Sequence, residues 1–220
     1  LSNKNNSNYR NKKLNNAFLG YEIQNKNIEV NIKKYALNSL KLNSEELIKN
    51  AVNDLIAGEV IAWVQGKMEF GPRALGNRSF LADPRKENII EKLNIKIKKR
   101  EKFRPFAPSV LDEFKDRFFD LNQRSDYMSF IVNVKAEARE LVPAIVHYDG
   151  SARPQTVIKN QNRLFWDLIY EFYKKTNVPM LLNTSFNINE PIACTENDSF
   201  KTFLKSDITK LYIGGYIVSK

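Results

Sequence analysis

The chain has 220 residues, 42% of them hydrophobic, and a formal net charge of +10. This size and composition fit one globular domain with a tail and exclude a wholly disordered protein. No apolar run is long enough to span a bilayer, and the single cysteine, Cys194, excludes an internal disulfide and fits a cytoplasmic location. The positive charge favours anionic partners such as nucleic acid or nucleotide phosphates.

The first 42 residues differ from the rest of the chain in composition and in the spacing of their apolar residues. Residues 1–16 are polar and low in complexity, which predicts a linker or disordered tail. Residues 17–42 contain short apolar pieces without a clear period, and we interpret them as a connector. A folded domain is therefore expected over residues 43–220.

Helical and extended patterns alternate through that domain. Apolar residues recur at helical spacing over 44–57, where Asn43 and Glu46 can form a capping box and Gly58 can end the helix. Further helices are predicted over 86–98, 164–173 and 200–204, and strands over 60–64, 130–134, 178–182, 211–213 and 216–218. This alternation predicts an α/β fold with a sheet covered by helices.

The segment 69–78 combines turn-forming residues with free cationic groups. Gly71 and Pro72 force a turn, which places Arg73 at a loop tip, and Gly76 permits a close backbone approach. An arginine at such a tip can grip a phosphate through two parallel hydrogen bonds. The alternative is a surface turn with solvated arginines.

A second basic segment, 98–106, follows the amphipathic helix predicted over 86–98. Its cations Lys98, Arg100 and Arg104 repel one another unless an anion lies between them, and a polyphosphate is such an anion. Pro105 stops any helix here. The alternative is a solvated basic face, to which we assign Lys96, Lys99 and Lys102.

The segment 183–187 follows a predicted buried strand. Its amides and hydroxyls, including Asn183, Ser185 and Asn187, lie where open α/β sheets usually bind ligands. Backbone N–H and hydroxyl groups at such a place can hold phosphate oxygens. The alternative is an ordinary turn and cap.

A fourth segment, 147–155, has a similar mixture of glycine, proline and polar residues. We interpret its single histidine, His147, as a polar ligand contact rather than a general base. The chain contains no Cys/His cluster, so no metal site formed by protein ligands is expected. Phosphate-binding glycine-rich motifs of the P-loop and dinucleotide-binding types are also missing from the sequence.

Together these segments resemble the C-terminal domain of the carbamoyltransferase family, which includes the NodU-type nodulation enzymes and the antibiotic O-carbamoyltransferases. The matching stretches are 68–85, 98–109, 147–157 and 183–192, in the same order as in the family. The resemblance covers the chain from about Ala17 to its C-terminus. Tyr148 and Ser151 depart from the residues expected in the third stretch.

The resemblance implies a YrdC-like fold, a twisted open mixed sheet flanked by helices. YrdC-type proteins have a paired K-x-R and S-x-N pattern. Lys98 and Arg100 match the first, and Ser185 and Asn187 match the second.

The activity implied by this resemblance is the formation of carbamoyl-adenylate from carbamoyl phosphate and ATP, with Mg²⁺ brought by the nucleotide. Because both reactants are anionic, catalysis requires cations that neutralise charge and align the partners. Arg73, Lys98 and Arg104 are the expected catalytic residues. The ATP and phosphate contacts implied are Arg73, Lys98, Arg100, Arg104, Arg153, Asn183, Ser185 and Asn187, with His147 and Asn77 as further candidates.

In this family a separate N-terminal domain transfers the carbamoyl group to an acceptor hydroxyl. The chain contains no candidate for that domain, so residues 17–42 are expected to connect to it, and the chain is expected to be part of a longer enzyme. No membrane partner is expected. Two alternatives stay open: an RNA-binding YrdC-like module, favoured by charge alone, and a threonylcarbamoyl-adenylate synthase, which shares the paired patterns.

Overall fold

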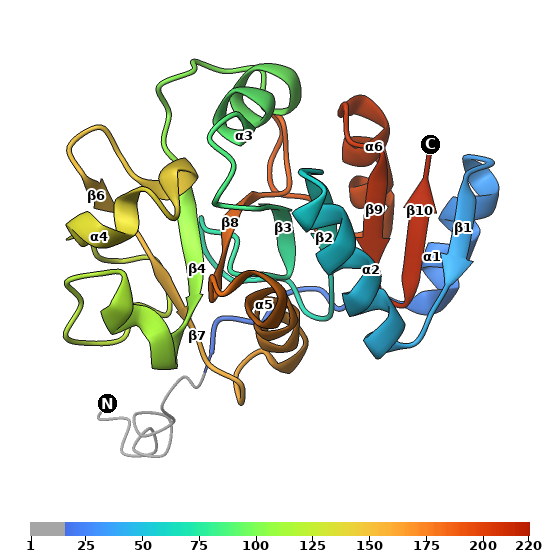
Figure 1. Ribbon diagram of the computed structural model, residues 1–220. Helices are drawn as coiled ribbons and strands as arrows, with labels where there is room; N and C mark the ends of the chain where they lie inside the picture. The colour runs from blue at the N-terminus through green and yellow to red at the C-terminus, as the bar shows by residue number, and fades with distance from the viewer. Residues whose placement is uncertain (1–15) are drawn as a thin grey trace, which may run out of the picture.

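A mixed sheet of eight strands organises the computed structural model, which describes residues 16–220 (Figure 1). The strand order is β1-β10-β9-β2-β3-β8-β4-β7, with β2–β9 and β4–β7 parallel and the other neighbours antiparallel. The strands are β1 Asn38–Lys41, β2 Ile61–Val64, β3 Arg78–Ala82, β4 Ala107–Leu111, β7 Gln155–Val157, β8 Met180–Ser185, β9 Lys210–Ile213 and β10 Tyr216–Ser219. The predicted α/β class with a mixed sheet is confirmed, and the YrdC-like detail stays a prediction. The tail predicted over residues 1–16 lies outside the described residues, apart from Asn16.

Helices flank this sheet in pairs. The α-helices are α1 Asn25–Lys34, α2 Ser44–Ile56, α3 Ile89–Glu91, α4 Ala136–Arg139, α5 Arg163–Thr176 and α6 Glu196–Lys205. Figure 1 shows α2 and α5 together in front of the strands, and these two helices pack against each other, as do α1 and α6. The 3₁₀ helices are Asp112–Arg117 and Pro143–Ile145, and a two-stranded sheet joins β5 Val132–Asn133 to β6 Ser151–Ala152. In residues 16–220, none of the helices has the length and apolar character that crossing a bilayer requires.

The local signals at α2 act as predicted. The Asn43 side chain accepts from the N–H of Glu46, and the Glu46 carboxylate accepts from the N–H of Asn43, completing the capping box. Gly58 follows the helix with a φ of +89°, a left-handed conformation that glycine adopts without strain. The apolar stripe of this helix is buried against the sheet and α5.

The single helix predicted over 86–98 is replaced by a short α3 and a π-helix over Lys92–Ile97. The wider winding lets the N–H of Lys98 donate to Leu93 O at 2.7 Å and turns Asn94 into the interior. Periodicity showed the apolar face correctly but could not show this change of pitch. π-Turns inside helices are often found at functional sites.

Residues 17–42, interpreted as a connector, contain two regular elements. β1 forms the edge of the main sheet beside β10, and all four of its side chains are exposed. In α1 only Ile28 and Asn31 are buried. Because so few side chains of this region face the core, its apolar residues have no visible period.

Strands β3, β4, β6 and β7 were not predicted, and neither was β1. β3 and β4 are buried along their whole length, yet polar residues or proline interrupt their apolar patterns at Arg78, Ser79, Pro108 and Ser109. The predicted strand 130–134 shortens to Val132–Asn133. The other predicted helices and strands are confirmed within a few residues at their ends.

Candidate functional site

A small cavity between β8 and three loops gathers half of the predicted site residues. It has a volume of about 130 Å³, and its lining includes Arg73, Arg100, Arg153, Asn183 and Ser185. We call it the arginine cavity. These residues come from segments far apart in the sequence, and the central position of β8 between β3 and β4 brings them together.

The arginine cavity has a strongly positive character. Burial lowers the pKa of the Arg153 guanidinium, and the charge of nearby Arg73 lowers it further. Burial likewise lowers the pKa of Arg100, with the charge of Arg104 adding to the effect. Among residues 16–220 no carboxylate lines the cavity. Such an arrangement of unpaired cations favours an anionic ligand.

The loop that presents Arg73 is closed by Glu69. The buried Glu69 Oε1 accepts from the backbone N–H groups of Leu75, Asn77 and Arg78 at 2.7, 2.7 and 3.2 Å. This carboxylate therefore fixes both sides of the loop while Arg73 at its tip stays exposed. Sequence reasoning missed this role of Glu69, although an acidic residue inside an otherwise basic motif was a visible signal.

Glycine 76 lets this loop approach helix α5. Gly76 has a φ of +106°, and a Cβ added there would lie 2.2 Å from the ring of Phe165. The close approach predicted from the sequence is confirmed. The loop is therefore anchored on α5 as well as on Glu69.

Arg78, in contrast to Arg73, is wholly buried and serves the fold. Its guanidinium donates to the backbone carbonyls of Gln65, Gly66, Asn77, Tyr21 and Cys194. Burial lowers its pKa, and the charge of Glu69 opposes that change. The incoming segment at Tyr21, the Arg73 loop and the chain before α6 are thus joined by one side chain.

Asn77 lies outside the arginine cavity. Its Nδ2 donates to Lys67 O at 2.7 Å, and its Oδ1 accepts from Asn162 Nδ2 at 2.8 Å. Both functional groups of this buried amide are occupied by the protein. The structure places Asn77 among the supports of the Arg73 loop.

The Lys98 side chain contacts Ser185 and Asn187, so it joins the two halves of the paired K-x-R and S-x-N pattern. Its buried Nζ lies 2.5 Å from Ser185 O, 3.2 Å from Ser185 Oγ, 2.8 Å from Asn187 O and 2.9 Å from Asn187 Oδ1. Burial lowers the pKa of Lys98 to about 7, with the charge of Arg100 adding to the effect. The four oxygens oppose that shift because they accept from the charged form. Lys98 and Asn187 shape the end of β8 and do not line the arginine cavity.

Arg100 is held in the arginine cavity by Asn94. Its Nε donates to Asn94 Oδ1 at 2.8 Å, and its guanidinium lies 4.9 Å from the ring centre of Phe106. The Nδ2 of Asn94 donates to the carbonyls of Lys102 and Arg104 at 3.0 and 2.9 Å. Asn94 thus holds the basic segment 98–106 in place through Arg100, Lys102 and Arg104. The sequence did not indicate this role, because Asn94 is there only one polar residue in an amphipathic pattern.

A buried amide network supports the floor of the arginine cavity. Asn183 Nδ2 donates to Ala74 O at 3.1 Å and Ser109 Oγ at 2.9 Å, and lies 3.3 Å from Gln155 Oε1. Ser109 Oγ donates to Gln155 Oε1 at 2.6 Å, and Gln155 Nε2 donates to Leu75 O at 2.9 Å. Ser109 and Gln155 lie on the unpredicted strands β4 and β7, which is why sequence reasoning missed them.

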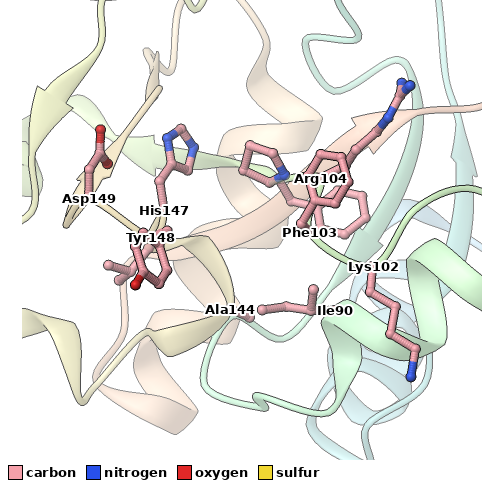
Figure 2. Close-up of a pocket in the computed structure, with 11 residues that line it drawn as sticks. Ile90, Lys102, Phe103, Arg104, Ala144, His147, Tyr148 and Asp149 are labelled. Atoms are coloured by element: carbon pink, nitrogen blue, oxygen red, sulfur yellow. The ribbon is translucent and has the colours of Figure 1, made fainter.

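A larger groove adjoins the arginine cavity and shares Pro105 and Phe106 with it. This aromatic groove has a volume of about 540 Å³, and its lining includes Phe103, Arg104 and Tyr148. Phe103 and Tyr148 are highly exposed, at 83% and 110%. Figure 2 shows the Arg104 side chain pointing away from Tyr148. The lining of the groove is thus mainly apolar and aromatic but includes charged side chains of both signs, whereas the charged side chains of the cavity are all cationic.

Arg104 and His147 line the aromatic groove and not the arginine cavity. Arg104 Nε lies 2.8 Å from the carboxylate of Glu101. His147 Nδ1 lies 3.1 Å from Ser151 Oγ, which donates its proton to Asp149 Oδ1 at 2.6 Å, so Nδ1 is the donor to Ser151. Burial lowers the pKa of His147. This geometry leaves Nε2 as an acceptor and gives Ser151 no base.

The part of the chain that the structure describes contains no group of three or more His, Cys, Asp or Glu side chains placed to hold a metal ion. The charged side chains that line the arginine cavity, Arg73, Arg100 and Arg153, are all cationic.

The family model for the carbamoyltransferase C-terminus matches residues 52–220. The nodulation protein NolNO of Sinorhizobium fredii is 48% identical over 180 residues, which are 80% of this chain and 26% of that protein. The nodulation protein NolO of Bradyrhizobium diazoefficiens is 46% identical over 181 residues, which are 80% of this chain and 33% of that protein. The chain thus spans about a quarter to a third of the length of these relatives.

HypF is among the solved structures that share the fold. HypF, in a full-length crystal structure described as the phosphate- and nucleotide-bound form, superposes with a TM-score of 0.51 at 16% sequence identity. The match covers 73% of this chain and 24% of the HypF chain. At this identity the likeness concerns the fold alone.

Proposed function

The chain belongs to the carbamoyltransferase C-terminus family, and we propose that it forms carbamoyl-adenylate from carbamoyl phosphate and ATP. The observation on which this rests is the arginine cavity, where Arg73, Arg100 and Arg153 meet without a carboxylate in its lining among residues 16–220. Three cations held close together by the fold are costly unless they serve an anion. The family and the cavity therefore support the same chemistry.

In the proposed reaction water first releases phosphate from carbamoyl phosphate, leaving carbamate. A carbamate oxygen then bonds to the α-phosphorus of ATP while the bond from that phosphorus to the β-phosphate oxygen breaks, and pyrophosphate leaves. Both partners are anions. Arg73, Arg100 and Arg153 would neutralise the phosphates and hold the two partners in line. Mg²⁺ brought by the nucleotide would withdraw further charge from the phosphates.

The aromatic groove is the proposed place of the adenosine. Its volume of about 540 Å³ lies in the range of about 300–1,000 Å³ typical of small-ligand pockets. The faces of Phe103 and Tyr148 are available for stacking with a base. The groove and the arginine cavity share Pro105 and Phe106, so a nucleotide with its base in the groove would have its phosphates directed towards the cavity.

Lys98 and Arg104 have different parts in this proposal. Lys98 holds Ser185 and Asn187 at the rim through its four oxygen contacts and acts on the ligand through them. Arg104 is exposed and pairs with the exposed Glu101, an ion pair of little net stability. A triphosphate lying between the groove and the cavity would compete with Glu101 for this guanidinium.

We further propose that a separate N-terminal domain transfers the carbamoyl group to an acceptor hydroxyl in the cytoplasm. The short span of this chain along its relatives supports a division of labour between domains. The isolated chain is then expected to release pyrophosphate without carbamoylating an acceptor.

Pyrophosphate release tests the proposal. The purified chain is mixed with MgATP, with and without carbamoyl phosphate, and pyrophosphate is measured by a coupled enzyme assay. Release that requires carbamoyl phosphate supports adenylate formation. Release that instead requires bicarbonate and threonine indicates threonylcarbamoyl-adenylate synthesis, and tight RNA binding without ATP binding indicates an RNA-binding module.

A further inference from the structure

The side chain of Asn183 contains an acceptor that the protein leaves unpaired. Asn183 is 1% exposed, and its Oδ1 is buried without a hydrogen-bond partner within residues 16–220. Its Nδ2 faces Ala74 O and Ser109 Oγ. Because a carbonyl oxygen can only accept, the amino group must point to Ala74 O, which fixes the orientation of the amide. In Asn183, which lines the arginine cavity, the acceptor is therefore unpaired and the donor is used by the protein.

This chemistry does not suit a phosphate oxygen. Phosphate oxygens are acceptors at neutral pH, so they repel Oδ1 rather than bond to it. A ligand group that carries N–H hydrogens would satisfy it. The sequence predicted that Asn183 contacts a phosphate. Its free acceptor instead requires a ligand atom that carries hydrogen.

Arg153 supplies a complementary group in the same cavity. Its Nε is buried and, among the residues described, has no hydrogen-bond partner. Asn183 and Arg153 line the same small cavity, and one has an unpaired acceptor while the other has an unpaired donor. This pair matches a primary amide, whose NH₂ donates and whose oxygen accepts.

We infer that Asn183 Oδ1 accepts from the NH₂ of the carbamoyl group and that Arg153 Nε donates to the oxygen of the same group. This inference rests on the proposed function, because it places carbamoyl phosphate in the arginine cavity. Asn183 is then a specificity residue. It selects a carbamoyl group over an acetyl group, which has a methyl where the NH₂ would be.

The amino group of adenine is the other N–H₂ donor that ATP chemistry brings to the site. The volumes of the cavity and the groove favour the carbamoyl group over adenine as the partner of Asn183. The arginine cavity, at about 130 Å³, lies below the usual range for a whole nucleoside, whereas the aromatic groove of about 540 Å³ lies within it.

The test compares two stable ligands of nearly the same shape by calorimetry. Phosphonoacetamide has the NH₂, and acetonylphosphonate has a methyl in its place. The unmodified chain is expected to bind the methyl ligand about 10- to 100-fold more weakly, because Oδ1 is then left unpaired. Asn183→Leu is expected to remove most of that difference. Asn183→Ser, which also removes Oδ1, is the second variant if the first does not fold, and it is expected to reduce the difference in the same way.

Ser109→Ala is the matched control. It removes one partner of Nδ2 and leaves the Ala74 contact and Oδ1 in place. It is expected to keep the preference for phosphonoacetamide even if both ligands bind more weakly. The inference is overturned if Ser109→Ala and Asn183→Leu lose the preference equally, since the network would then be merely structural.

Two further results would also overturn it. One is equal binding of both ligands, or binding of neither, by the unmodified chain. The other is a changed preference between ATP and inosine triphosphate in Asn183→Leu with the phosphonate preference intact, because the amide would then contact adenine. Pyrophosphate release, measured on the same samples, distinguishes a failure of this inference from a failure of the proposed function. A chain that prefers phosphonoacetamide but releases no pyrophosphate contradicts the proposed function and not this inference.

Discussion

Arg73 and Arg78 lie five residues apart in one segment, yet the fold uses them in opposite ways. Arg78 is buried, and its guanidinium donates to five backbone carbonyls. Arg73 is exposed at a loop tip and lines a cavity with two other arginines. A cation whose donors are all used holds the structure together, whereas a cation with free donors beside like charges is available to a ligand.

The same contrast holds between Lys98 and Arg153. Lys98 has four oxygens around its ammonium, while the Nε of Arg153 is buried without a partner among residues 16–220.

Replacing Arg78 should damage the fold most. Arg78→Met leaves five carbonyls and the buried Glu69 without their cation, and we expect the free energy of unfolding to fall by about 3–5 kcal/mol. Urea denaturation followed by circular dichroism measures it. Arg73→Met, the control in the same segment, should change stability by no more than about 0.5 kcal/mol. Equal losses of stability in the two variants would contradict the different roles of Arg78 and Arg73.

Replacing Arg73 should damage catalysis instead. Arg73→Ala removes a donor placed for the phosphates, and we expect pyrophosphate release to slow by about 10²–10³-fold, or about 3–4 kcal/mol. The rate with carbamoyl phosphate and MgATP is measured against the unmodified chain. A rate within a factor of a few of the unmodified chain would place Arg73 outside the reaction.

Lys98 should make stability depend on pH. Its pKa is about 7 in the folded chain and about 10.5 when unfolded. Between these values the unfolded chain binds a proton that the folded chain does not, so the free energy of unfolding should rise with pH from about 7 to 10.5, by up to about 1.4 kcal/mol per pH unit. Denaturation of Lys98→Met across this range should lack that slope, and an identical slope in both proteins would argue against it.

The aromatic groove should affect affinity more than rate. Replacing Phe103 with alanine removes a stacking face, and we expect the KM for ATP to rise by about 10-fold, or about 1–2 kcal/mol, with kcat little changed. Initial rates over a range of ATP concentrations give both constants. Phe130→Ala, on another exposed aromatic outside the groove, is the control. A fall in kcat without a change in KM would separate the groove from ATP binding.

The sequence predicted those parts of the fold in which one local pattern decides the outcome. The capping box at Asn43 and the close approach at Gly76 follow from neighbouring residues alone. β3 and β4 escaped prediction because Arg78 and Ser109 interrupt their apolar patterns, and the partners of those polar groups come from distant segments.

Half of the residues that sequence motifs assigned to the candidate site line the arginine cavity, and the motifs indicated none of the geometry of that cavity. Motifs pointed to Arg73, Arg153 and Asn183, and these do line one cavity. That Lys98 is enclosed by four oxygens depends on how β8 meets the basic loop, which no local pattern encodes. Asn94 and Glu69 were missed for the same reason, since each acts through backbone groups that only the folded chain brings near.

The most direct test of the account is calorimetric titration of MgATP into the unmodified chain and into Arg73→Ala, with Arg163→Ala as a control for charge. Arg163 is exposed on α5 and paired with Asp167 at 2.7 Å. The account predicts that Arg73→Ala abolishes or severely weakens MgATP binding, while Arg163→Ala binds as the unmodified chain does. Equal binding by all three proteins, or no binding by the unmodified chain, would contradict the claim that the free cations of the arginine cavity serve a nucleotide.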